Sequence, residues 1–211
     1  MANLKAHQKY VTSSGETVPG ATTVLNILNK PALIPWAWEL GRQGIDLNKA
    51  RTLAMDTGTC AHLMIAGYIK GEKPDLADFN KEMVDKAETA FLAFLEWEKQ
   101  NGVKWIFSEL QLVSDDLRYG GTIDAIAQHG DAFWLIDFKT SKSGACYPEY
   151  KYQVAAYRNL YESTKKTEIQ QGIILCLDKE TGIPTPHHII DTIKEFEIFR
   201  HCLEIYWLQK R

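Results

Sequence analysis

The sequence is poor in cysteine and has no long hydrophobic run. Its four cysteines are scattered over 211 residues without C-x-x-C spacing, so we expect reduced, mostly buried thiols of a cytoplasmic protein (Cys60, Cys146, Cys176, Cys202). No apolar stretch reaches the roughly 18 residues that a membrane helix needs, and residues 1–16 hold no apolar segment. We therefore expect neither a membrane span nor a signal peptide.

An excess of positive charge is also absent. The chain carries 24 Lys and Arg against 27 Asp and Glu, a net charge of −3. This balance argues against a protein that coats nucleic acid through bulk charge, although it leaves room for a local basic track. With 45% hydrophobic residues, the chain predicts one globular domain with a sizeable core.

What the sequence does contain is a set of three strand-like segments between Trp105 and Lys142. The first alternates around Glu109, the second runs from about 121 to 128, and the third from about 133 to 140. Residues 129–131, with the sequence His-Gly-Asp, have the composition of a turn between the last two. We therefore predict three consecutive antiparallel strands.

Charged residues fall on these strands where a stable sheet would carry apolar ones. A turn centred near residues 130–131 sets Asp124 opposite Asp137. Side-chain alternation puts Lys139 on the same face as Asp137. Two buried carboxylates repel each other, whereas a divalent metal such as Mg²⁺ would hold them together. The lysine would then orient or deprotonate a water molecule, or neutralise charge on a phosphate. The alternative is a surface hairpin with ordinary Asp–Lys pairs.

Three motifs, in this order, resemble those of a known family. They are GGTID at 120–124, IDFKT at 136–140 and QVAAY at 153–157. Together they resemble the PD-(D/E)XK nuclease superfamily, most closely its RecB-type branch of phage and bacterial exonucleases and the mitochondrial genome maintenance exonuclease. The resemblance covers roughly residues 22–176. It implies an α/β fold with a restriction-endonuclease-like core, in which helices flank a mixed central β-sheet and an N-terminal helical portion precedes it.

One domain is predicted over residues 1–211. Residues 1–103 form its mainly helical N-terminal portion, and the nuclease core runs from 104 to 177, with a closing helix after it. Apolar periodicity predicts helices over about 22–29, from Pro35 to Gly41 or Gly44, from Thr57 or Thr59 to Lys70, over 79–100 and over 148–162. Residues 192–195, Thr-Ile-Lys-Glu, form a capping box for the last helix.

The resemblance implies the metal ligands. GTCAH at 58–62 matches the Gly-Thr-x-x-His helix of the family, whose histidine binds the metal. His62 is therefore expected to bind the ion together with Asp124 and Asp137, although a lone histidine on a helix is more often structural. The carbonyl oxygen of Phe138 is expected as a further ligand. Imidazole suits Mn²⁺ better than Mg²⁺, so His62 favours manganese.

The same resemblance implies the catalytic and substrate-binding residues. Asp124, Asp137 and Lys139 are expected to be catalytic, with Glu109 as a second carboxylate contributor. For Glu109 the alternative is an edge-strand residue that faces water. The residues expected to bind the substrate follow Lys139 along the chain: Thr140, Lys142, Gln153 and Tyr157.

Aromatic residues recur beside these motifs. Trp36 and Trp38 have two interpretations, either core packing or a stacking surface for an unpaired base. The segment from Tyr147 to Tyr161 combines several tyrosines with lysine and arginine, a mixture that suits a groove for a DNA strand.

The expected function is that of a metal-dependent DNA exonuclease of recombination, repair or phage DNA metabolism. Its cofactor would be one or two Mg²⁺ or Mn²⁺ ions. The late cysteine cluster of iron–sulfur relatives is missing, so we expect no such cluster. The expected partners are DNA with a free end and a recombinase, single-strand annealing protein or helicase, in a bacterial or phage-infected cytoplasm. The alternatives are a structure-specific or nicking endonuclease with the same site, and a non-catalytic DNA- or partner-binding module.

Overall fold

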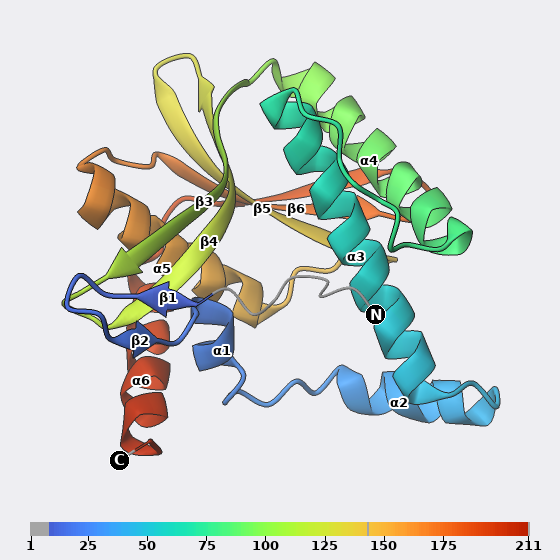
Figure 1. Ribbon diagram of the computed structural model, residues 1–211, viewed down its shortest axis with the longest axis horizontal. Coiled ribbons are helices and arrows are strands. Elements are labelled where there is room, and N and C mark those ends of the chain that lie inside the picture. Colours follow the sequence, from blue (N-terminus) through green and yellow to red (C-terminus); the bar gives the residue numbers. More distant parts are fainter. Residues whose placement is uncertain (1–8, 143, 211) are drawn as a thin grey trace.

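The computed structural model describes residues 9–142 and 144–210, and it consists of a mixed β-sheet with helices on both faces (Figure 1). The strands are β1 (Tyr10–Val11), β2 (Thr17–Val18), β3 (Lys104–Ser114), β4 (Tyr119–His129), β5 (Ala132–Ser141), β6 (Gln171–Asp178) and β7 (Pro184–Ile189). The helices are α1 (Ala21–Leu25), α2 (Leu33–Arg42), α3 (Leu47–Lys70), α4 (Lys81–Asn101), α5 (Pro148–Lys165) and α6 (Ile193–Leu208).

The main sheet has the strand order β3-β4-β5-β6-β7. β3, β4 and β5 follow one another along the chain and pair antiparallel, as short turns between strands allow. β6 runs parallel to β5, and α5 forms the crossover connection between them. β7 returns antiparallel to β6. The predicted mixed sheet flanked by helices is therefore confirmed.

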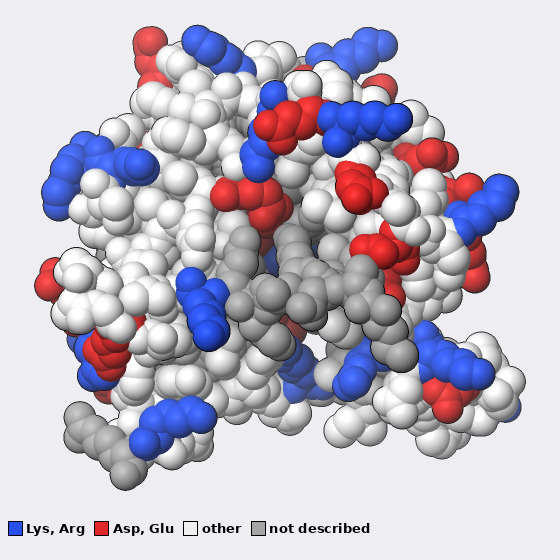
Figure 2. Space-filling view, viewed as in Figure 1, with Lys and Arg blue, Asp and Glu red and all other residues white. Residues whose placement is uncertain are grey.

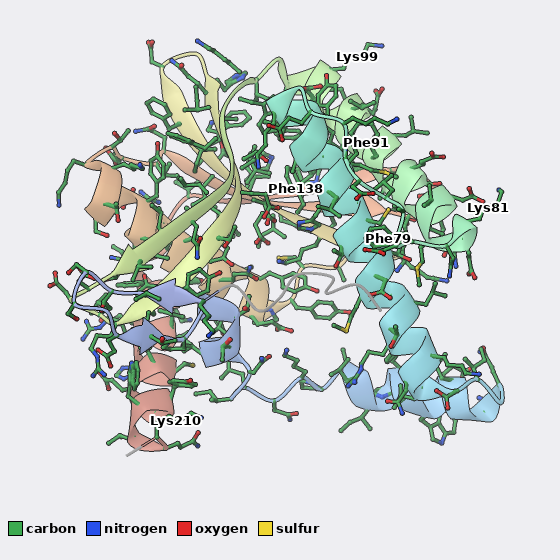
Figure 3. The ribbon with its side chains drawn as sticks, viewed as in Figure 1. Phe79, Lys81, Phe91, Lys99, Phe138 and Lys210 are labelled. Atoms are coloured by element: carbon green, nitrogen blue, oxygen red, sulfur yellow. The ribbon has the colours of Figure 1, made fainter. Side chains whose placement is uncertain are left out.

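Two hydrophobic clusters cover the two faces of the sheet. On one face α3 and α4 bury Ala125, Ile136 and Leu175, and on the other α5, α6 and α1 bury Leu135 and Ile174. Phe138 belongs to the first cluster, and its ring packs edge-on against Phe94 with 5.6 Å between the ring centroids. Figure 3 shows Phe138 in the middle of the molecule, close to α3.

The third helix begins about ten residues earlier than the predicted Thr57 or Thr59. Asp46 is its N-cap, with the side chain accepting a hydrogen bond of 2.8 Å from the Lys49 amide. The prediction was wrong because Thr57 and Thr59 were interpreted as possible caps, whereas both lie inside the helix, as does Gly58 between them. A Cβ at Gly58 would stand 3.0 Å from Oγ1 of Thr140, so glycine allows α3 to approach the end of β5 closely. His62 consequently lies in the middle of α3.

Two other expectations need correction. Thr192 is the N-cap residue of α6, but its side chain makes no capping hydrogen bond, so the predicted capping box does not form. Asp191 instead accepts a hydrogen bond of 2.9 Å from the Ile193 amide. The interpretation of Trp38 as a core residue is wrong, because its side chain is 63% exposed. The helix α2 as a whole has no buried residue. The cause is its position beside α3, away from the sheet (Figure 1).

Within the described ranges, 9–142 and 144–210, no helix combines the length and apolarity needed to cross a membrane.

Candidate active site

The site lies where β4 and β5 separate. Their ladder is regular from the pair His129–Ala132 to the pair Ala125–Ile136 and ends there, one position before Asp124 and Asp137. From that point β4 pairs only with β3, and β5 pairs only with β6. The Asp124 side chain bridges the opening, because its Oδ2 accepts a 2.8 Å hydrogen bond from the Phe138 amide.

Glu109 reaches the same place from β3. The β3–β4 ladder pairs Ser108 with Ala125 and Leu110 with Ile123, and Glu109 lies between them, across from Asp124. Its backbone has φ 55°, a left-handed conformation that is rare for a non-glycine residue within a strand. Such strain persists where surrounding structure imposes it, and it gathers at functional sites.

His62 enters the opening from α3. Its Nε2 lies 3.2 Å from the carbonyl oxygen of Phe138, which can only accept, so this nitrogen carries the proton. Nδ1 lies 3.5 Å from Oδ1 of Asp124, and this carboxylate favours a proton on Nδ1 as well in the metal-free site. The nitrogen of His62 and one carboxylate oxygen each from Glu109 and Asp124 all lie within 4.8 Å of one another.

Phe138 links the hydrophobic core to this group of ligand atoms. Its buried ring fixes the strand backbone, and both of its backbone polar groups face the site. The amide orients Asp124, and the carbonyl orients His62. A histidine that donates one ring N–H to a backbone carbonyl is held in the tautomer that a metal requires.

The charged groups in the opening shift one another's pKa values. Burial by itself lowers the pKa of His62, but the negative charge of Asp124 outweighs it and the pKa is raised. Burial by itself raises the pKa of Asp124, yet the charges of His62 and Lys139 and the Phe138 amide hold it below its usual value. Asp124 is therefore an anion at neutral pH.

Asp137 is the least satisfied group in the site. It is fully buried, and among residues 9–142 and 144–210 neither of its carboxylate oxygens has a hydrogen-bond partner of good geometry. Nζ of Lys139 lies 2.7 Å from its Oδ2 as an ion pair. Burial, and then the charge of Asp124, raise the pKa of Asp137 to about 6 despite this lysine. A buried carboxylate with an unpartnered oxygen costs free energy unless something binds it.

Lys139 is held by side chains of α5. Its ammonium donates a 3.1 Å hydrogen bond to Oε1 of Gln153, whose amide in turn donates a 3.0 Å bond to the Tyr157 hydroxyl. The ring of Tyr150 lies 5.0 Å from Nζ. Burial would lower the pKa of Lys139, but Asp137 and Asp124 outweigh it and raise it. The lysine is therefore a cation at neutral pH.

A divalent metal fits these residues. Three carboxylates, of Glu109, Asp124 and Asp137, gather around one lysine and one histidine, and the Oδ1 of Asp137 has no partner. The donor set of carboxylate oxygens and one imidazole suits Mg²⁺ or, better, Mn²⁺. Asp137 lies outside the compact group formed by His62, Glu109 and Asp124, so its role as a ligand stays a prediction.

Most of the residues predicted for the site are brought together, but two lie at its margin. Thr140 is half-buried near Gly58 of α3. Lys142 is largely exposed and forms an ion pair of 3.0 Å with Glu180. Gln153 and Tyr157 are buried and contact Lys139 directly or through each other, so their contact with a substrate also stays a prediction.

Sequence reasoning did not assign Tyr150 or the paired glycines to the site. Tyr150 shares one face of α5 with Gln153 and Tyr157, at spacings of three and four, which is a signal that the sequence contained. A Cβ at Gly121 would come within 2.5 Å of the Tyr157 ring, and one at Gly120 would come within 2.4 Å of Tyr10. The two glycines thus leave room for two aromatic rings against β4.

The face of the molecule seen in Figure 2 has no patch of a single charge. In Figure 2 basic and acidic residues are interspersed, in agreement with the small net charge. The same view shows a notch between the body of the molecule and the region of α2, with lysine or arginine atoms at its rim.

Comparison with solved structures shows the fold. A protein of Eubacterium rectale, provisionally assigned as an exonuclease, matches 72% of this chain with a TM-score of 0.51 at 15% identity; the match spans 65% of that protein. An alkaline exonuclease of Laribacter hongkongensis, in complex with dAMP, matches with a TM-score of 0.48 at 14% identity. The match covers 91% of this chain and 87% of the Laribacter chain. No protein-family model matches the chain, and no curated protein matches it. The chain therefore shares its fold with the Eubacterium rectale protein.

Proposed function

We propose that this protein is a metal-dependent deoxyribonuclease that hydrolyses DNA from a free end. The observation that carries the proposal is the buried Asp137 carboxylate beside Lys139, next to a compact group of His62, Glu109 and Asp124. Buried, unsatisfied charge of this kind is costly and gathers at binding and catalytic sites. The fold shared with a protein provisionally assigned as an exonuclease supports cutting from an end.

His62, Glu109 and Asp124 would hold the metal ion, and Asp137 would contribute its unpartnered oxygen. When bound, a divalent ion supplies charge stabilisation for a phosphate and lowers the pKa of a bound water. Phe138 keeps two of these ligands oriented through its amide and carbonyl groups. The protein's contribution is therefore a rigid set of ligands at the point where the sheet opens.

Lys139 acts as a fixed positive charge in this proposal. Asp137 and Asp124 raise its pKa and keep it protonated at neutral pH in the metal-free site, and as a cation it would orient the attacking water and stabilise charge on the phosphate. Gln153 and Tyr150 limit the positions that its flexible side chain can take. We assign both as positioning residues for Lys139.

The test is a digest of the same DNA in linear and in covalently closed circular form, with Mg²⁺, with Mn²⁺ and with excess EDTA. We expect the linear form to be degraded with either metal, the circle to persist, and EDTA to abolish cleavage. Equal cutting of the circle would favour the endonuclease alternative. No cleavage under any condition would favour the non-catalytic module, and cleavage in EDTA would remove the proposed mechanism.

A further inference from the structure

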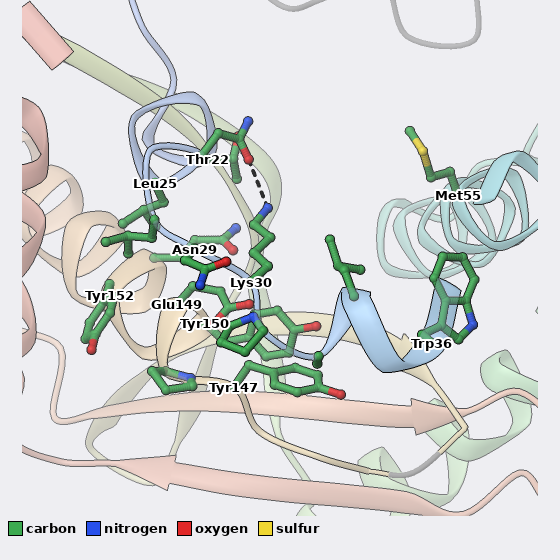
Figure 4. A pocket seen from close by; sticks show the side chains of 17 residues that line it. Thr22, Leu25, Asn29, Lys30, Trp36, Met55, Tyr147, Glu149, Tyr150 and Tyr152 are labelled. Carbon is green, nitrogen blue, oxygen red and sulfur yellow. Dashed lines mark hydrogen bonds between the residues drawn. The ribbon is translucent and has the colours of Figure 1, made fainter. Parts of the chain in front are cut away.

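A large groove lies beside the site, between the segment from Thr22 to Trp36 and the first turns of α5. Its volume is about 1030 Å³. Figure 4 shows Trp36 and Met55 on one side, and Tyr147, Tyr150 and Tyr152 on the other. This places residues of α2 and α3 across from residues of α5.

The groove is continuous with the proposed catalytic centre. Tyr150 and Gln153 are among the residues that line it. The same two side chains contact Nζ of Lys139, the ring at 5.0 Å and the amide oxygen at 3.1 Å. A molecule in the groove would therefore lie against the residues that hold the catalytic lysine.

The lining suits bases better than phosphates. Flat aromatic rings make up much of its surface, from Trp36, Tyr147, Tyr150 and Tyr152. Among the described residues that line it, Lys30 is the one cation, and its ammonium already donates a 2.9 Å hydrogen bond to Asn26. The described lining of the groove thus lacks the cations that contact the two phosphate backbones of a duplex. Its aromatic rings, in contrast, can stack on unpaired bases of any sequence.

A second cavity, of about 480 Å³, adjoins the groove at Trp36. Four lysines line it: Lys49, Lys86, Lys142 and Lys179. Two of them are ion-paired at its edge, Lys142 with Glu180 at 3.0 Å and Lys86 with Glu82 at 2.8 Å. Lys179 is half-buried among like charges, and its pKa is lowered by burial and by Lys142 and Lys86. Trp36 therefore stands between an aromatic groove and a cationic cavity, the combination with which proteins bind the bases and the phosphates of a single strand.

The exposure of α2 is consistent with an occupied groove. This helix buries none of its residues and exposes large apolar side chains, with Ile34 71% and Trp36 36% exposed. Exposed apolar surface of this kind, next to polar groups, marks a binding site.

We propose that the groove binds unpaired nucleotides of the strand that is cut, with bases stacked on Trp36 and on the tyrosines of α5. The inference rests on the proposed nuclease function and deepens it, because it makes a single-stranded DNA end the substrate. The phosphates of the same strand lie beside the lysines of the second cavity.

Binding is measured in EDTA, where no cleavage is needed, by fluorescence anisotropy of labelled oligo(dT) and of a blunt DNA hairpin. We expect wild-type protein to prefer oligo(dT). Trp36→Ala removes one stacking ring and should weaken oligo(dT) binding by about 5- to 100-fold. Trp38→Ala is the matched control, since this tryptophan is on the same helix but does not line the groove, and binding should stay within about 2-fold.

Tyr147→Leu is the second variant, because leucine keeps an apolar side chain but removes the flat ring. It should also weaken oligo(dT) binding, and melting temperatures of all variants show whether each one is folded. Equal effects of Trp36→Ala and Trp38→Ala, or tighter binding of the hairpin, would overturn the inference. The nuclease proposal can fail separately. A protein that binds oligo(dT) through Trp36 but does not cleave it would contradict the nuclease proposal and would support the inference about the groove.

Discussion

The two ends of the β4–β5 pair differ in their ladder pairing and in the side chains that they bury. Towards the turn, from Ala125 to His129 and from Ala132 to Ile136, each residue has a ladder partner, and the interior positions carry apolar side chains. Beyond Ala125 and Ile136 the strands separate, and charged side chains replace apolar ones in the interior.

This difference shows how one hairpin serves two purposes. The closed end gains stability from ladder hydrogen bonds and from apolar burial on both faces. The open end lacks the ladder hydrogen bonds between β4 and β5. It has a strained backbone at Glu109 and an unsatisfied carboxylate at Asp137. Stability from the closed end holds the open end in a geometry that it would not adopt alone.

The largest expected effect comes from replacing charges at the open end. Asp124→Asn weakens a metal ligand, so Mn²⁺ affinity and cleavage should both fall, cleavage by ~10²-fold or more. Lys139→Met should reduce cleavage by a similar factor, but Mn²⁺ affinity should stay level or rise because a competing cation is gone. Calorimetric titration with Mn²⁺ and a cleavage assay measure the two quantities.

Asp131→Asn is the control for this pair, because Asp131 is an exposed acid at the turn of the closed end. Cleavage and metal affinity should both match the wild type. If Lys139→Met lost the metal as badly as Asp124→Asn, the division of roles between the two residues would be wrong.

A smaller effect is expected in the pH dependence of stabilisation by metal. The pKa of Asp137 is raised from 3.8 to about 6, so its contribution to stability is full below about pH 4 and is lost as the pH rises through 6. His62, whose pKa is also raised, acts in the same direction at higher pH. A metal replaces the lost protons, and Mn²⁺ should therefore raise the melting temperature more at pH 8 than at pH 5. An equal rise at both pH values would contradict this account.

The sequence predicted the open end only in part. Alternation and the turn at residues 129–131 placed Asp124, Asp137 and Lys139 together, because strand periodicity is local. The separation of the strands at this position was not predictable, since the Phe138 amide bonds to the Asp124 side chain there and not to the β4 backbone, which strand periodicity does not encode. The resemblance named His62 as a ligand, but its position in the middle of α3 follows from the cap at Asp46.

The groove was harder to predict than the site. The tyrosines of α5 indicated a strand-binding surface, but the opposite wall consists of Trp36 and Met55, which are distant in sequence. Hydrophobic patterning equally allowed Trp36 and Trp38 to pack in a core. Only tertiary structure shows that α2 lies away from the sheet and that one of the two tryptophans faces the groove.

The smallest effects are expected for two glycines of the β4–β5 pair. One lies at the closed end and one at the open end, so the two variants compare the ends directly. Gly130, at the closed end, has φ +58° and open space around it, so Gly130→Ala should cost ~1 kcal/mol of stability through backbone strain and leave cleavage unchanged. Gly121, on the diverging part of β4, is covered by the Tyr157 ring. Gly121→Ala should cost ~1–3 kcal/mol, because the ring or the strand must move.

The two variants should also differ in activity. A displaced Tyr157 loses its hydrogen bond from Gln153, which in turn holds Lys139, so the Gly121→Ala protein should cleave more slowly even at temperatures where it is fully folded. Denaturant unfolding gives the stability of each variant, and cleavage rates per folded molecule give the activity. Normal cleavage by folded Gly121→Ala protein would mean that Tyr157 and Gln153 support the fold but do not position the lysine.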